Sequence, residues 1–298
     1  MPKHEGPPMK TLRYSEAFYS VQGEGNFIGT PSVFLRSFGC NLRCQGFGLT
    51  RGTPKKKISD EVVALLDNGV LDRVSKFEDL PMVRTGCDTY ASIYPEFKKY
   101  MMDRSVDQVV EHILSLTPEN KWQMDNGQDI HFILTGGEPL LWQRFWLNLF
   151  EHPRMQDLRN LTVETNTTQQ LQPQFAEYLS TQNRFQVTWA CSPKLTVSAE
   201  PWKNAIRPEI ARSYLNIDKS KMYLKFVVAD NIDIDDVHKA VKEFSDGGVD
   251  VPVYVMPVGG CKEEYGENKV NVAELALAKG WRYSPRLQVE LFGNSWGT

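Results

Sequence analysis

The hydrophobic positions of the chain form short β-rich runs separated by stretches with helical periodicity. Val, Ile, Phe and Tyr dominate the runs, and Gly, Pro, Asn or Asp follows most of them. This pattern predicts strands at residues 32–38, 131–135, 161–165, 185–190, 223–229, 251–256 and 286–292.

Between several of these runs, apolar residues recur at the three- and four-residue spacing of a helix face. This spacing predicts helices over 106–116, 232–244 and 270–280, the last with Gly280 as its C-cap. Strands that alternate with helices indicate βα units and a mainly parallel sheet. The number of units favours a barrel or partial barrel, in which functional residues lie just after the carboxyl ends of the strands.

Residues 47–105 do not follow this alternation. The segment is rich in Lys, Asp, Gly and Pro and contains only one modest helical stretch, at 59–71. Long irregular insertions in compact domains are usually functional covers or disordered loops. We therefore expect a single domain over 1–298 with an insertion at 48–84 that covers the functional site.

Length and charge limit the classes of function. The chain has 298 residues, enough for one large domain or two small ones. Its net charge of −3 gives no electrostatic basis for nucleic-acid binding. The short basic run 55–57 is typical of a solvated loop. No apolar run reaches the roughly 18 residues of a membrane span, and the polar N-terminus does not resemble a signal peptide. We expect a cytoplasmic protein with no membrane partner.

The chain has five cysteines: Cys40, Cys44, Cys87, Cys191 and Cys261. An odd number without an export signal argues against a disulfide framework, and each thiol taken alone is more often a buried apolar filler. Cys40 and Cys44, just after the first predicted strand, have the spacing that begins a C-x3-C-x2-C motif. The third cysteine of that motif should stand at position 47, which is Phe.

Other ligand-capable segments follow later strands. They are GGEP at 136–139, Thr165 with Asn166, CSPK at 191–194, and Met256 with Pro257. Each is individually weak, since a Gly-Gly pair is more often a turn. Their joint placement after strands indicates a site.

This set of motifs resembles the radical S-adenosylmethionine (SAM) enzymes. The resemblance implies a partial (β/α)6-type radical SAM barrel with a long insertion after the first strand. In that family three cysteines bind three irons of a 4Fe–4S cluster, the fourth iron binds SAM, and GGEP contacts the SAM amino group. Thiolates are the soft ligands that such clusters require, and a vacant iron follows the logic of an open catalytic metal site.

A closer resemblance implies Cys87 as the third ligand. Cys87, Asp88 and Thr89 are similar to the Cys-Asp-Thr triplet of the 7-carboxy-7-deazaguanine synthases, although 42 residues (45–86) separate Cys44 from Cys87. An insertion that split the motif explains this, because loop-closure entropy grows only logarithmically with length. The alternatives are an incidental Cys87, Cys191 or Cys261 as third ligand, or a zinc site of three cysteines, which would explain neither GGEP nor SPK.

The resemblance to this family covers most of the chain outside 48–84 and is most specific at EAFYSVQGEGNFIGTPSVFLRSFGC, residues 16–40. It implies that a carboxylated tetrahydropterin contacts Val21, Gln22, Gly23, Glu24, Arg36 and Thr135. The chemistry agrees, because Arg binds carboxylates through two parallel hydrogen bonds and Gln and Glu pair with a ring edge. A tight turn at 22–25 and a surface salt bridge at Arg36 are the plainer alternatives.

The resemblance also implies the remaining roles. Thr89 would bind Mg2+, and Glu164 and Asn166 would contact SAM or substrate. The tail 291–298 would close over the substrate, and Phe47 would take the place of the family's aromatic residue between the second and third cysteines. SAM contacts are expected at Gly86, Cys87, Asp88, Gly137, Glu138, Ser192, Pro193 and Lys194.

The implied reaction is a Mg2+-dependent ring contraction for 7-deazaguanine or queuosine-type biosynthesis. A reduced cluster would cleave SAM to methionine and a 5′-deoxyadenosyl radical, which takes hydrogen from C6 of 6-carboxy-5,6,7,8-tetrahydropterin. The ring contracts to 7-carboxy-7-deazaguanine and ammonia leaves. The family also implies a homodimer and an electron donor such as flavodoxin or ferredoxin. The alternatives are a radical SAM activating enzyme for another substrate and a non-catalytic homologue that binds a partner through its insertion.

Overall fold

The computed structural model describes residues 9–260 and 262–298 and contains one nine-stranded sheet. The strands follow the order β3-β1-β2-β4-β5-β6-β7-β8-β9. Their bounds are β1 Thr11–Val21, β2 Pro31–Ser37, β3 Met102–Ser105, β4 His131–Gly136, β5 Asn160–Thr165, β6 Gln186–Cys191, β7 Lys221–Val228, β8 Val253–Pro257 and β9 Arg282–Tyr283.

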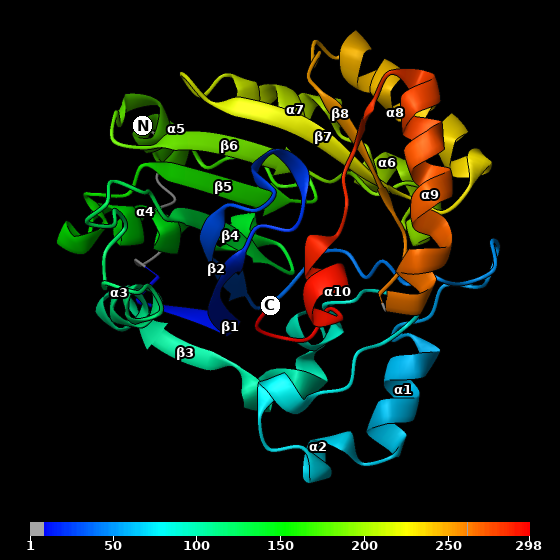
Figure 1. Cartoon of the computed structure of the whole chain (residues 1–298), viewed down its shortest axis with the longest axis horizontal. Helices are drawn as coiled ribbons and strands as arrows, with labels where there is room; N and C mark the ends of the chain where they lie inside the picture. The colour runs from blue at the N-terminus through cyan, green and yellow to red at the C-terminus, as the bar shows by residue number, and fades with distance from the viewer. Residues whose placement is uncertain (1–8, 261) are drawn as a thin grey trace.

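From β2 to β9 every neighbouring pair of strands is parallel, whereas β1 is antiparallel to both β2 and β3. The sheet curves, and its described edge strands are β3 and β9 (Figure 1). The predicted partial barrel is therefore confirmed. Six of the predicted strands coincide with β2 and β4–β8, while β1, β3 and β9 were not predicted.

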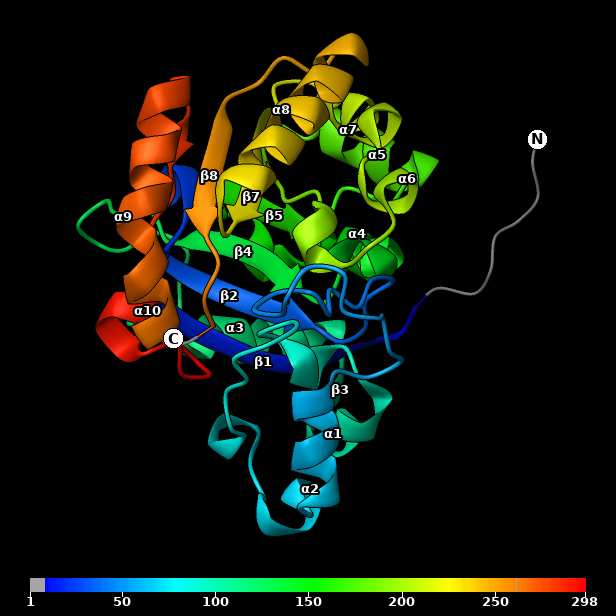
Figure 2. The same cartoon turned by 90° about the vertical axis from the view of Figure 1, so that its right-hand side faces the viewer.

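Most of the helices cover the outer face of the curved sheet (Figure 2). Val33 and Leu35 of β2 join the main core on this face, whereas the intervening Phe34 packs inside the curve against Phe18 and Ile133. None of the helices in the described residues is long and apolar enough to cross a membrane. The helices that contribute side chains to the main core are α3 Val106–Ser115, α4 Gln143–Glu151, α5 Pro173–Thr181, α7 Pro208–Leu215, α8 Asn231–Asp246 and α9 Lys262–Lys279.

The strand predicted at 286–292 is wrong, because Leu287–Phe292 forms helix α10. The alternation of polar and apolar residues resembled a half-buried strand. The sheet already ends at β9, and Pro285, which has no N–H, separates this segment from that strand. The segment instead turns back over the inside of the curve, where the amide of Leu287 donates to the Gly23 carbonyl (3.1 Å).

The insertion is more ordered than its composition predicted. It contains α1 (Asp60–Asp67) and α2 (Val70–Arg73), and both views show it extending from one end of the molecule (Figures 1 and 2). The insertion has its own apolar cluster, separate from the main core. This cluster also contains residues that follow the insertion, up to position 97, and Trp296 from the tail. Its buried members are Val62, Val70, Phe77, Leu80, Val83, Tyr90, Ala91, Ile93, Tyr94, Phe97 and Trp296.

Candidate active site

A cavity of about 1610 Å³, including its open mouth, lies at the carboxyl ends of the parallel strands. Ligand pockets commonly measure roughly 300–1,000 Å³, so this one has room for more than one small molecule. All but two of the residues predicted for the site line it, the exceptions being Glu138 and Pro193. The predicted residues that line the cavity are Val21, Gln22, Gly23, Glu24, Arg36, Cys40, Cys44, Gly86, Cys87, Asp88, Thr89, Thr135, Gly137, Glu164, Asn166, Ser192 and Lys194.

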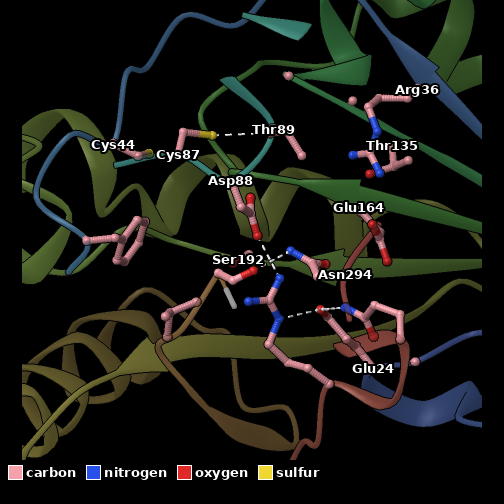
Figure 3. Close-up of a pocket in the computed structure, with 18 of the residues that line it drawn as sticks. Glu24, Arg36, Cys44, Cys87, Asp88, Thr89, Thr135, Glu164, Ser192 and Asn294 are labelled. Carbon is pink, nitrogen blue, oxygen red and sulfur yellow. Dashed lines mark hydrogen bonds and ion pairs between the residues drawn. The ribbon is translucent and has the colours of Figure 1, made fainter. Parts of the chain in front are cut away.

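Three thiols occupy one end of this cavity. Cys40 follows β2, and Cys87 comes from the far side of the insertion to lie near Cys44 (Figure 3). The thiols are close enough that Cys87 and Cys40 both contribute to the electrostatic environment of Cys44. The structure thus brings together three cysteines that the sequence separates by an insertion.

Burial keeps these thiols protonated in the metal-free protein. Burial raises the pKa of Cys40 to about 12, and it raises the pKa values of Cys44 and Cys87 as well. The Lys194 ammonium opposes this rise at all three thiols because it favours a nearby thiolate. Metal ions bind the thiolate, so a metal at this end must displace protons that burial otherwise holds.

Polar donors also approach the sulfur atoms. The amide of Leu42 and the side-chain amide of Asn166 lie 3.4 and 3.7 Å from Cys40 Sγ, and Thr89 Oγ1 lies 3.2 Å from Cys87 Sγ. Hydrogen bonds to sulfur tune an iron–sulfur centre and favour the charged ligand. Asn166 and Thr89 therefore lie next to the thiols, whereas the expected roles of Thr89 in Mg2+ binding and of Asn166 in SAM or substrate contact stay predictions.

The rival cysteines have different surroundings. Cys191 is fully buried in the main core on the outer face of β6, whereas the preceding Ala190 faces the inside of the curve. Cys191 does not line the cavity, and burial raises its pKa to about 12. This is the environment of an apolar filler. Cys261 lies outside the described residues.

The opposite end of the cavity is lined by charged side chains in one row of the sheet. Glu16, Arg36 and Thr135 are register partners across β1, β2 and β4. The Arg36 Nε donates to Glu16 Oε1 (2.6 Å), and both side chains are largely buried. In Figure 3 Arg36 lies beside Thr135. Arg36 is therefore not a surface salt bridge but a cation held against the cavity wall.

Glu24 is the centre of a buried network of charges. Its carboxylate pairs with Lys225 and with Arg286 Nε (3.3 Å), and it accepts a hydrogen bond from Gln288 Nε2 (2.7 Å). Arg286 Nη2 also pairs with Asp88 Oδ2 (2.6 Å; Figure 3), which joins the polar end to the segment that carries Cys87. Burial alone would raise the pKa of Glu24, but Lys225 and Arg286 outweigh it and lower this pKa to about 2. Glu24 is thus an ionised acceptor at neutral pH.

Gln288 explains the glycine at position 23. A Cβ on Gly23 would lie 1.8 Å from Gln288 Oε1 and 3.0 Å from its backbone nitrogen. Gly25 has the positive φ of +67° that a turn requires, and a Cβ there would also collide with the Tyr223 ring, 2.7 Å from Cζ. The GEG segment therefore combines a turn with a close approach of α10. Gln288 Oε1 is buried and has no hydrogen-bond partner among the described residues.

The two predicted residues that do not line the cavity have other surroundings. The Glu138 carboxylate accepts bonds from the Leu140 amide (3.0 Å), the Thr165 hydroxyl (2.8 Å) and the Asn166 amide (2.8 Å). It thereby joins the loops after β4 and β5. A direct contact of Glu138 or Pro193 with SAM stays a prediction. Gly137 lines the cavity, and its hydrogen atom is also a packing requirement, since a Cβ would lie 2.2 Å from the Gly39 carbonyl oxygen.

Sequence reasoning missed several residues that complete the site. Lys225 is the one cation within residues 222–228 of β7, which are otherwise uncharged, and that pattern could have indicated it. Arg286 and Gln288 were hidden by the wrong strand prediction, and Glu16 lies in a strand that was not predicted. The tail residues Asn294, Ser295, Trp296 and Thr298 also line the cavity, although no individual contact had been predicted for them.

The chain is similar to several known proteins. Proteins named 7-carboxy-7-deazaguanine synthase match from Halobacterium salinarum (28% identical, covering 98% of this chain and 93% of the relative) and Pyrobaculum aerophilum (26% identical, covering 96% and 97%). A third match comes from Rhodopirellula baltica (28% identical, covering 97% and 89%). The crystal structure of QueE from Escherichia coli superimposes with a TM-score of 0.50 at 16% identity, covering 92% of this chain and 93% of that one. No family model matches the chain.

The fold, a curved and mainly parallel sheet with its cavity at the strand ends, is similar to that of QueE. The sequence matches point to one group of enzymes. Over nearly its whole length the chain is similar to proteins named 7-carboxy-7-deazaguanine synthase.

Proposed function

We propose that this protein is a radical SAM enzyme that converts 6-carboxy-5,6,7,8-tetrahydropterin to 7-carboxy-7-deazaguanine with loss of ammonia. The observation that carries the proposal is one cavity with two different ends, a thiol end with Cys40, Cys44 and Cys87 and a polar end with Arg36 and Glu24. Similarity to proteins named for this product supports the choice of substrate.

The thiol end fits a 4Fe–4S cluster. Its donors are soft sulfur atoms, and no three His, Cys, Asp or Glu side chains of the described residues are arranged to hold a single metal ion. A cluster would place each thiolate on its own iron and leave one iron for SAM. When bound, it would supply the electron that cleaves SAM and so begins hydrogen abstraction from the substrate.

The residues between the two ends would hold SAM. Lys194 Nζ donates to Ser192 Oγ (3.1 Å), and an ammonium has three donors, so this lysine can also bind an anionic group. Asp88 is held by Arg286 and lines the same region as Gly86 and Gly137. These side chains and backbone groups would orient SAM and exclude water from its reactive carbon.

The polar end would bind the pterin. Arg36 uses Nε for Glu16, and its two terminal nitrogens would bind the substrate carboxylate, with the Thr135 hydroxyl beside them. The ring edge presents an exocyclic amine and ring N–H groups. Glu24 and Gln288 Oε1 are adjacent acceptors in fixed positions, which suits two such donors.

Two further requirements complete the proposal. A Mg2+ ion at the Thr89 hydroxyl would neutralise and orient the substrate carboxylate. An external one-electron donor, such as flavodoxin or ferredoxin, would reduce the enzyme, which we propose acts as a homodimer. Substrate and product differ by the elements of one ammonia, so the net conversion itself is redox-neutral.

The test is an anaerobic assay of reconstituted protein with SAM, a reductant, Mg2+ and the pterin, read by mass. The proposal predicts 7-carboxy-7-deazaguanine and ammonia, and it predicts that Arg36→Gln loses most turnover while the exposed Arg13→Gln does not. Cleavage of SAM without conversion of the pterin would indicate an activating enzyme for another substrate. A full cluster without SAM cleavage would indicate a non-catalytic homologue.

A further inference from the structure

The two ends of the insertion meet next to the thiols. The Gly86 amide donates to the Phe47 carbonyl (2.8 Å), so the chain that leaves after Cys44 is bonded to the chain that returns at Cys87. A Cβ on Gly48 would lie 2.8 Å from the Arg84 carbonyl oxygen, which shows how closely the two ends pack. A single backbone bond is a weak constraint on a long segment, so this meeting point needs further support.

One acidic side chain gives that support on the returning side. Oε2 of Glu61 accepts hydrogen bonds from the Arg84 amide (2.9 Å), the Thr85 amide (2.8 Å) and the Thr85 hydroxyl (2.9 Å). Glu61 lies in the first turn of α1, and the next residue, Val62, is fully buried in the insertion's own core. The packed insertion thus holds the two residues that precede Gly86 and Cys87.

A second carboxylate acts in the same way on the other side. Glu200 Oε1 accepts hydrogen bonds from the amides of Arg43 (2.7 Å) and Cys44 (2.8 Å), and its Oε2 pairs with Lys55 of the insertion (2.6 Å). Cys44 has a φ of +49°, which is sterically unfavourable for a residue other than glycine. The Glu200 bonds hold it in that conformation.

We propose that Glu61 and Glu200 are positioning residues that rejoin the split cysteine motif before any metal binds. Neither touches the thiols; each fixes the backbone beside one of them. The insertion then acts as a scaffold that delivers Cys87, and not only as a cover. Prearranged ligands spare the cluster the entropic cost of ordering a 42-residue segment. The proposal rests on the function above only in taking Cys87 as a cluster ligand.

The test uses the thiol itself in the metal-free full chain. The alkylation rate of Cys87 is measured by mass spectrometry, with the core thiol Cys191 as internal reference, and iron uptake is then measured after anaerobic reconstitution. Glu61→Ala should raise Cys87 alkylation about tenfold relative to Cys191, the effect of losing hydrogen bonds to a charged group, and should lower iron uptake. Glu61→Gln, which keeps an acceptor oxygen, should restore much of both, and Glu78→Ala, at an exposed acid of the same insertion, should change neither.

Three outcomes would overturn the proposal. They are an unchanged Cys87 rate in Glu61→Ala, an equal rise at Cys191, which would show general destabilisation, and no recovery in Glu61→Gln. Should Glu61→Ala fail to fold, Thr85→Val removes one of the three donors and must give a smaller rise that is still selective for Cys87. If the unmodified protein takes up no iron, the proposed function fails, while the alkylation rates still decide the role of Glu61.

Discussion

At the scale of single residues, polar side chains of the cavity use only part of their bonding capacity within the protein. Arg36 gives Nε to Glu16, and Gln288 gives Nε2 to Glu24 while its Oε1 has no partner in the described part of the chain. A side chain held at one atom loses little freedom when a ligand binds the other. The same arrangement would make these residues selective, since a buried acceptor left unpaired costs free energy.

We predict that Gln288→Ala raises KM for the pterin about tenfold, or about 1.4 kcal/mol, with a smaller effect on kcat. The reason is that the variant removes an acceptor that binds the ring edge in ground and transition states alike. Steady-state kinetics at saturating SAM measures both constants. Leu291→Ala, at an exposed position of the same helix, is the matched control. An unchanged KM in Gln288→Ala would remove this residue from the substrate site.

At the scale of elements, the insertion and the tail depend on one another. Trp296 is 8% exposed, packs against Phe77 (ring centroids 4.7 Å apart) and Tyr90 (5.8 Å), and donates from Nε1 to the Leu80 carbonyl (2.9 Å). The next amide, Gly297, donates to Glu16 Oε2 (2.8 Å), the carboxylate that holds Arg36. A single aromatic side chain thus connects the insertion to the polar end of the cavity.

We predict that Trp296→Ala loosens the insertion while the sheet stays intact. Truncating a buried Trp costs about 3–5 kcal/mol, and here the loss falls on a small separate core. Amide hydrogen exchange should therefore speed up over residues 60–84 and stay unchanged in β4 and β5. Trp296→Phe should recover most of the protection, because it loses mainly the bond to Leu80. Equal acceleration in the sheet and the insertion would contradict this account.

Helices and strands were predictable from the sequence where the hydrophobic pattern fits only one type of secondary structure. The buried parallel strands are continuous apolar runs bounded by turn residues, and α3 and α8 have clear helical periodicity, so both kinds were placed within a few residues. The segment at 287–292 alternates like a strand, but only the ending of the sheet at β9 decides that it is a helix. The insertion's order was hidden because its core is completed by Trp296, which is far away in sequence.

At the scale of the whole molecule, most of the cavity could be foreseen from motifs that follow strands, because parallel strands bring their carboxyl ends to one edge. The charge network could not. Lys225 comes from β7, and Arg286 and Gln288 come from the start of α10; each reaches Glu24 only through tertiary packing. The split cysteine motif was partly predictable. The Cys-Asp-Thr triplet indicated Cys87 in the sequence, but only the folded insertion brings Cys87 to the other two thiols.

The central claim is that Cys40, Cys44 and Cys87 hold one 4Fe–4S cluster across the insertion. The most direct measurement is iron content and electronic spectrum after anaerobic reconstitution of Cys87→Ala beside Cys191→Ala. The account predicts about four irons per chain in the unmodified protein and in Cys191→Ala, and loss of the cluster in Cys87→Ala. A full cluster with full turnover in Cys87→Ala would contradict it.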